Sequence, residues 1–125
     1  MVMSMAGCAP QMSKVNDPHT LVSSEDNYRT VYEVFVYSFC DSNGDGVGDL
    51  RGVISKLDYI EDMGFDAIWL SPVCPSPTYH KYDVTDYTDI DPEYGTLEDY
   101  EALIEACHAR NIHVYNDMVM NHSSS

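Results

Sequence analysis

Hydrophobic residues gather in three short runs that are separated by two amphipathic stretches. The runs at 32–39, 67–70 and 112–119 are rich in β-branched and aromatic residues, which is typical of buried strands. Apolar residues recur every three or four positions over 50–63 and 97–107, which predicts two helices. The apolar positions are Leu50, Val53, Ile54, Leu57, Ile60 and Met63 in the first helix and Leu97, Tyr100, Leu103, Ile104 and Cys107 in the second.

Polar residues around these stretches indicate where the two helices begin and where one of them ends. Asp49 and Thr96 precede the helical patterns, and their side-chain oxygens can accept the free N–H groups of a first turn, so we expect both to be N-caps. Gly64 follows the first pattern and is expected to end that helix.

The order strand, helix, strand, helix, strand predicts an α/β fold with parallel strands and right-handed crossovers. Such a sheet is either doubly wound or part of a (β/α) barrel. A doubly wound nucleotide-binding fold is disfavoured because no GxGxxG or GK[ST] loop follows the first strand. A full barrel needs about 250 residues, so we expect this chain to be the first part of a larger structure.

Residues 1–30 are expected to be a leader or linker that precedes a structured region at 31–125. The short apolar start ends in Ala6-Gly7-Cys8, which resembles the end of a bacterial lipoprotein signal without its basic region. Two interpretations stay open: a lipid anchor at Cys8, with an extracellular or cell-surface location, or an extension without function, which leaves the cytoplasm open. No apolar run approaches the roughly 20 residues of a transmembrane segment.

The charge balance limits the class of partner. The chain has 21 acidic residues against 6 Lys and Arg, a formal net charge of −15. This charge repels nucleic-acid phosphates and anionic membranes, and it suits divalent cations where the acids cluster.

The four cysteines form no CxxC pair and have no His at zinc-ligand spacing, so a structural zinc site is not expected. Cys107 falls on a helical apolar stripe and is expected in the core. Cys40 and Cys74 could form a disulfide or remain free thiols.

The acidic, glycine-rich loop at 41–49 predicts a calcium site. Calcium takes six to eight oxygen ligands, and the loop offers Asp41, Asn43, Asp45, Asp49 and the carbonyl of Val47. An EF-hand is excluded because its twelfth position would be Gly52 instead of Glu, and because a strand precedes the loop. A solvated acidic turn without metal is the alternative.

Four segments in order resemble the N-terminal part of the catalytic barrel of glycoside hydrolase family 13, the α-amylase family. They are residues 35–39 followed by DSNGDGVGDLRGV, the helix and strand LDYIEDMGFDAIWLSP, the loop YHKYDVTDYTDIDPEYGT, and the segment DMVMNH at 117–122. The resemblance implies a partial TIM (β/α)8 barrel over residues 31–125, with its first three strands and two helices.

The resemblance also implies roles for individual residues. Tyr82 would stack on the sugar just before the cleavage point, and His122 would hydrogen-bond the same sugar. Asp117 would orient catalytic neighbours, and Asn121 would brace the loop. The metal ligands would be Asp41, Asn43, Asp45, Val47 through its carbonyl, and Asp49.

The family cleaves or transfers α-glucosidic bonds with retention, which needs two carboxylates about 5 Å apart. The resemblance places the nucleophilic Asp, the acid Glu and a third Asp after the fourth, fifth and seventh strands, beyond Ser125. No catalytic residue is therefore assigned here. We expect a truncated piece of a starch- or maltooligosaccharide-degrading α-amylase, inactive by itself.

Alternative functions stay open within and outside the family. Members that trim glucose commonly carry an Asp three residues before the stacking Tyr, where this chain has Tyr79. The resemblance therefore favours an α-amylase over an oligo-1,6-glucosidase, a related α-glucosidase or a transglycosylase. A calcium-stabilised α/β sugar-binding module without catalysis is the alternative from another class.

Overall fold

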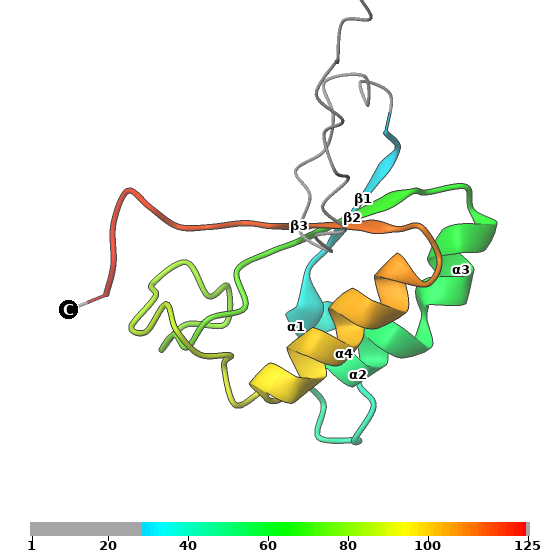
Figure 1. Ribbon diagram of the computed structural model, residues 1–125. Coiled ribbons are helices and arrows are strands. Elements are labelled where there is room, and N and C mark those ends of the chain that lie inside the picture. Colours follow the sequence, from blue (N-terminus) through cyan, green and yellow to red (C-terminus); the bar gives the residue numbers. More distant parts are fainter. Residues whose placement is uncertain (1–28, 125) are drawn as a thin grey trace, which may run out of the picture.

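The computed structural model describes residues 29–124 (Figure 1). The predicted leader and the proposed anchor at Cys8 lie outside the described residues, apart from the last two positions of the leader. No helix in the described part is long and apolar enough to cross a membrane.

Three parallel strands form the sheet, in the order β1-β2-β3. They are β1 (Val31–Val34), β2 (Ala67–Leu70) and β3 (His113–Asn116). Ala67 of the central strand aligns with Val31 on one side and with His113 on the other, so the three strands begin and end together. The predicted parallel α/β sheet is confirmed.

The first and third strands are shorter than the sequence pattern predicts. The ladder ends at Leu70, where the Ser71 N–H donates to the Val34 carbonyl and the Asp117 N–H donates to the Leu70 carbonyl. Beyond this edge no strand among the described residues continues the ladder. Residues Val36–Phe39 instead form a short helix, α1, despite their strand-like composition. Tertiary context overrides β-propensity here.

The predicted helix over 50–63 is broken at Lys56 into α2 (Leu50–Ser55) and α3 (Leu57–Asp62). The Ser55 hydroxyl donates to the Gly52 carbonyl, a local bond that competes with the helical pattern and bends helices. The break leaves the apolar stripe in place: Leu50, Val53, Leu57 and Ile60 are fully buried, whereas Met63 is half exposed.

The predicted helix caps are confirmed. The Asp49 carboxylate accepts the Gly52 N–H at the start of α2. Thr96 forms a capping box with Asp99 at the start of α4 (Leu97–His108). Gly64 follows α3 with φ of 83°, a left-handed conformation that glycine adopts without strain.

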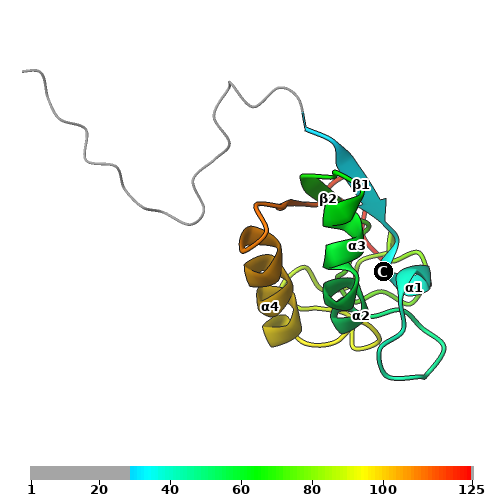
Figure 2. The ribbon, with the colours of Figure 1, turned by 90° about the vertical axis from the view of Figure 1, so that its right-hand side faces the viewer.

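Helices α2, α3 and α4 lie on the same side of the sheet (Figures 1 and 2). The core lies between these helices and the strands, and contains Val34, Ile68, Leu70, Val53, Leu57, Ile60, Leu103 and Cys107. Cys107 is buried as predicted, and burial raises the pKa of its thiol to about 12. In the register row Glu33–Trp69–Tyr115, Trp69 is 46% exposed, so the sheet is open to solvent at this row among the described residues.

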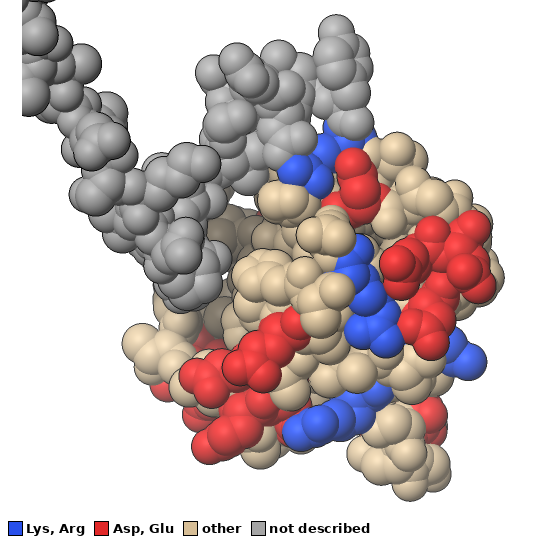
Figure 3. Space-filling view, turned by 45° about the vertical axis from the view of Figure 1, so that its right-hand side comes forward, with Lys and Arg blue, Asp and Glu red and all other residues tan. Residues whose placement is uncertain are grey.

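Acidic and basic side chains alternate on the face shown in Figure 3. Arg110 donates to Asp58 of α3 at 2.7 Å and lies 3.7 Å from Glu61, and Arg51 pairs with Asp99 of α4. These pairs link helices across the surface and offset part of the local acidic charge. Exposed pairs contribute little to stability, about 0–1 kcal/mol each.

Gly52 is a position where any side chain would collide with backbone. An ideal Cβ there would lie 1.8 Å from the Cys40 carbonyl oxygen. We expect Gly52→Ala to lower the free energy of unfolding of the whole protein by about 3 kcal/mol, measured by urea unfolding. The control Gly44→Ala meets open space and only the strain of φ of 85°, about 1 kcal/mol. A loss at Gly52 no larger than at Gly44 would contradict the close packing.

Candidate sugar-binding site

The segments that follow the three strands meet at one edge of the sheet, because the carboxyl ends of parallel strands lie together. The first is the acidic loop at 41–49, the second is the long loop at 71–96, and the third begins at Asp117. Functional groups of barrels lie at this edge, which is where the predicted site residues fall.

Tyr82 and Asp117 are brought together at this edge although 35 positions separate them. The Tyr82 hydroxyl donates to Asp117 Oδ2 at 2.7 Å. This hydrogen bond, with a smaller contribution from burial, raises the pKa of Tyr82. The side chain is still 39% exposed, so its ring is available to a ligand while its hydroxyl is held.

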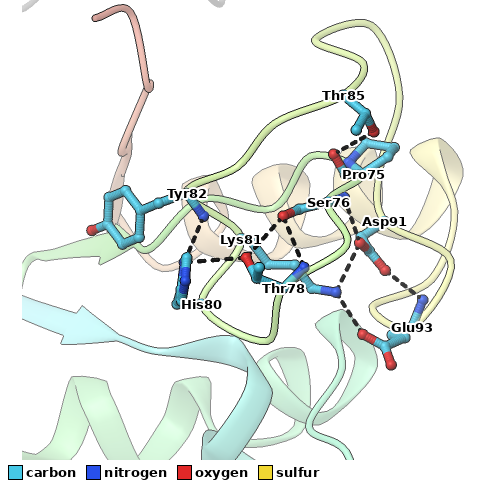
Figure 4. Close-up of polar contacts among 9 residues, drawn as sticks. All are labelled: Pro75, Ser76, Thr78, His80, Lys81, Tyr82, Thr85, Asp91 and Glu93. Atoms are coloured by element: carbon cyan, nitrogen blue, oxygen red, sulfur yellow. Dashed lines mark hydrogen bonds and ion pairs between the residues drawn. The ribbon is translucent and has the colours of Figure 1, made fainter. Parts of the chain in front are cut away.

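His80 lies beside Tyr82 and was not predicted as a site residue. The Tyr82 N–H donates to His80 Nδ1 at 3.1 Å (Figure 4). The other ring nitrogen of His80, Nε2, lies 3.9 Å from Asp83. The sequence offered no sign of this contact beyond the two-residue spacing between His80 and Tyr82.

Lys81, between these two residues, is almost completely buried, with 2% of its side chain exposed. Its ammonium lies 2.8 Å from Asp91 and 2.5 Å from Glu93, and 5.2 Å from the centre of the Tyr94 ring. Burial alone would lower the pKa of Lys81, but hydrogen bonds to the two carboxylates outweigh burial and raise it. A buried, doubly paired lysine was not predicted from the sequence.

His122 lies in a different part of the edge. It lines a hollow of about 450 Å³ together with Tyr87 and residues 118–123. The Tyr87 hydroxyl donates to the carbonyls of Val119 and His122 at 2.7 and 3.0 Å, which ties this segment to the loop after β2. No hydrogen bond in the described part of the chain joins the His122 ring to Tyr82 or Asp117.

The acidic loop folds back on itself through its own side chains. Asp41 accepts the N–H groups of Asn43, Gly44 and Gly46. The Gly46 and Gly44 bonds lower the pKa of Asp41, which keeps this exposed carboxylate ionised. The side chains of Asn43 and Asp45 accept the N–H groups two residues further on.

Asp49 has a structural role in the same loop. One carboxylate oxygen caps α2, and the other accepts the N–H and hydroxyl of Ser42, both at 2.9 Å. Asp49 is 5% exposed, the most buried acid of the loop. It therefore fixes the loop to the helix, whatever else it binds.

The donor types of the loop, which are carboxylate, amide and carbonyl oxygens, are those that a hard cation such as Ca²⁺ prefers. A carboxylate oxygen has two lone-pair sites, so an oxygen that accepts one N–H can still coordinate a metal. Among the described residues, no three His, Cys, Asp or Glu side chains form a cluster that could hold a metal. The three carboxylates of the predicted set, Asp41, Asp45 and Asp49, are therefore not gathered into such a cluster in this structure. The other two predicted ligands are the amide of Asn43 and the carbonyl of Val47.

Cys40, Cys74 and Cys107 are free thiols. Of the two states left open for Cys40 and Cys74, the structure has the reduced one. Cys40 lies next to Ser55 of α2, with 3.8 Å between sulfur and hydroxyl oxygen.

Comparison with known proteins agrees with the fold. Residues 33–125 match the family described as "Alpha amylase, catalytic domain". The chain is 58% identical over 94 residues to "Alpha-amylase 3" of Dictyoglomus thermophilum, covering 75% of this chain and 19% of that protein. It is 53% identical over 95 residues to an oligo-1,6-glucosidase of Bacillus cereus, covering 75% and 17%.

A solved structure, Eubacterium rectale Amy13B, superposes with a TM-score of 0.78 at 64% identity, covering 79% of this chain and 19% of that chain. The fold is thus the N-terminal part of a TIM barrel of the glycoside hydrolase class. The chain belongs to the α-amylase family. It spans about a fifth of the length of the relatives it matches.

The contact between Tyr82 and Asp117 has a measurable pH signature. Asp117→Asn should lower the pKa of Tyr82 toward the ordinary value of about 10, because the charged acceptor is lost. In the unsubstituted chain the protonated hydroxyl donates at neutral pH, and the bond is lost only as the pH rises through the raised pKa. Carbon-13 NMR of labelled tyrosine would follow the titration. Glu101→Gln, on the exposed side of α4, is the control, and an unchanged Tyr82 titration in Asp117→Asn would refute the contact.

Proposed function

We propose that the whole protein hydrolyses α-glucosidic bonds of starch or maltooligosaccharides with retention of configuration, and that residues 31–125 form the first part of its catalytic barrel. The observation that carries this proposal is the Tyr82–Asp117 pair at the carboxyl edge of the parallel sheet. In an α-amylase-family chain, this edge is where a sugar is bound.

The described residues supply binding and orientation. The Tyr82 ring would stack on the sugar before the cleavage point, and its hydroxyl, held by Asp117, would keep the ring from rotating away. Asp117 would orient catalytic neighbours from its place directly after β3. His122 would hydrogen-bond the same sugar, with its backbone held by Tyr87.

The bond-breaking groups are proposed to lie outside this chain. Retention requires a nucleophilic carboxylate and an acid–base carboxylate about 5 Å apart. The family resemblance places both after later strands, so we propose that the 125-residue chain alone is inactive. An extracellular or cell-surface location, with a lipid at Cys8, belongs to the same proposal because Ala6-Gly7-Cys8 resembles the end of a lipoprotein signal.

The aromatic position next to the site favours an amylase over an oligo-1,6-glucosidase. Tyr79 is 63% exposed, and its ring centre lies 5.9 Å from that of Tyr37. Ring contacts lead from Tyr79 through His80 to Tyr82. A row of aromatic rings of this kind suits an extended glucan, whereas a carboxylate at position 79 is common in relatives that trim single glucose units.

Activity of the whole protein tests this preference. We expect faster cleavage of maltopentaose than of isomaltose. Tyr82→Ala should lower kcat/KM for maltopentaose at least about tenfold, equivalent to about 1.4 kcal/mol. Tyr59→Ala, an exposed tyrosine of α3, is the matched control. Faster cleavage of isomaltose would favour the oligo-1,6-glucosidase function. Sugar binding without cleavage would favour a non-catalytic module.

We also propose that the acidic loop holds Ca²⁺ through Asp41, Asn43, Asp45, the Val47 carbonyl and Asp49. The bound ion would neutralise the clustered negative charge and fix the loop against α2. No chemical step is assigned to it.

Thermal unfolding of the whole protein tests the calcium proposal. Calcium at 100 times its Kd should stabilise the protein by about 2.7 kcal/mol, which raises the Tm. Asp45→Ala should lower the Tm and remove its dependence on calcium, while Asp62→Ala at the end of α3 should leave that dependence intact. Equal melting in calcium and in chelator would exclude the site.

A further inference from the structure

Lys81 is a buried cation in a loop. Its ammonium is removed from water and depends on Asp91, Glu93 and the Tyr94 ring for compensation. Burial of an unpaired ammonium costs several kcal/mol, so the side chain stays buried only while these partners are in place.

The partners of Lys81 are themselves fixed. Asp91 Oδ2 also accepts the Ser76 N–H at 3.0 Å, and its Oδ1 accepts the Glu93 N–H at 3.0 Å. Asp91 is 4% exposed, and its own N–H donates to the Val73 carbonyl at 2.8 Å. The ammonium therefore joins the beginning of the loop, near Ser76, to its end, near Glu93 (Figure 4).

The backbone of Lys81 has an unfavourable conformation. Its φ is 62°, and its N–H closes a tight turn by donating to the Thr78 carbonyl at 3.1 Å. The left-handed conformation costs a residue with a Cβ about 1–2 kcal/mol and persists where surrounding contacts enforce it. The ion pairs of the side chain are contacts of this kind.

The turn at Lys81 determines where Tyr82 points. The side chains of Lys81 and Tyr82 leave the turn in opposite directions, one toward Asp91 and Glu93 and the other away from them (Figure 4). The Tyr82 ring reaches Asp117 on the far side.

We infer that Lys81 is a positioning residue of the sugar site: its ammonium, bound between Asp91 and Glu93, holds the turn that places Tyr82 against Asp117. The consequence for catalysis rests on the proposed function, whereas the placement of Tyr82 does not.

Nitration by tetranitromethane, which attacks the phenolate, reports on Tyr82 without requiring activity. The bond to Asp117 raises the pKa of Tyr82 and protects it. In Lys81→Met of the whole protein, release of Tyr82 should speed its nitration several-fold, since each unit of pKa lost raises the phenolate fraction about tenfold. Peptide mass spectrometry measures Tyr82 against Tyr59, the exposed internal standard.

Three further variants make this test specific. Lys81→Arg keeps the cation and should retain slow nitration of Tyr82. Lys56→Met, which removes an exposed lysine between α2 and α3, should behave as the unsubstituted protein does. If Lys81→Met does not fold, Glu93→Gln removes only the more exposed partner and should still speed nitration.

Lys81→Gly separates the effect of the Lys81 side chain from the effect of its backbone conformation. Glycine adopts φ of 62° freely, so this variant keeps the turn accessible while it removes the ammonium. We expect fast nitration of Tyr82 in Lys81→Gly. Slow nitration in both Lys81→Gly and a folded Lys81→Met would overturn the inference, because the turn alone would then place Tyr82.

Kinetics give the second arm of the test. Lys81→Met should raise KM for maltopentaose more than it lowers kcat. The resulting loss of kcat/KM should largely vanish in a protein that already carries Tyr82→Ala, since the effects of substitutions at coupled residues are non-additive. Additive losses would show a general structural role and overturn the inference. If the unsubstituted protein is inactive but Lys81→Met still speeds the nitration of Tyr82, the proposed function is refuted. The positioning role of Lys81 is then still supported.

Discussion

The parallel register of the central strand is the constraint on which the rest of the structure depends. β2 aligns residue for residue with β1 and β3, so all three strands end at the same level. The following segments therefore emerge side by side, and Tyr82 after β2 can reach Asp117 after β3. A shift of one residue in either pairing would reverse which side chains of the shifted strand face the helices. It would also move Tyr82 and Asp117 apart.

The loop after β2 carries Tyr82 of the proposed sugar site. It is long and irregular, yet it is held at its base by the buried Lys81–Asp91 pair and at its far side by the Tyr87 hydroxyl on the backbone of 119–122. Between these two attachments it presents Tyr82 with the ring partly exposed and the hydroxyl bound. A buried ion pair is weak evidence for stability, but it can specify one conformation of a loop that lacks regular hydrogen bonding.

The sequence predicted the parts of the fold that depend on local signals. The central strand, the caps at Asp49 and Thr96 and the stop at Gly64 follow from hydrophobic pattern and capping chemistry. The turn of 36–39 into α1 was missed because the end of a strand is decided by its neighbour, which the local pattern does not contain. For the candidate site, motif resemblance predicted Tyr82 and Asp117, which the structure brings into contact. The buried state of Lys81 was not predicted, because it depends on acids ten and twelve positions away that no periodicity connects to it.

We propose that the carboxyl edge of this sheet binds a glucan through Tyr82, with the Tyr82 ring positioned by Asp117. A crystal structure of the whole protein with a bound, uncleaved maltooligosaccharide tests it most directly. We expect a sugar ring stacked on the Tyr82 ring, with the tyrosine hydroxyl still donating to Asp117. An oligosaccharide bound in the catalytic cleft without contact to Tyr82, or a Tyr82 hydroxyl that has left Asp117, would contradict it.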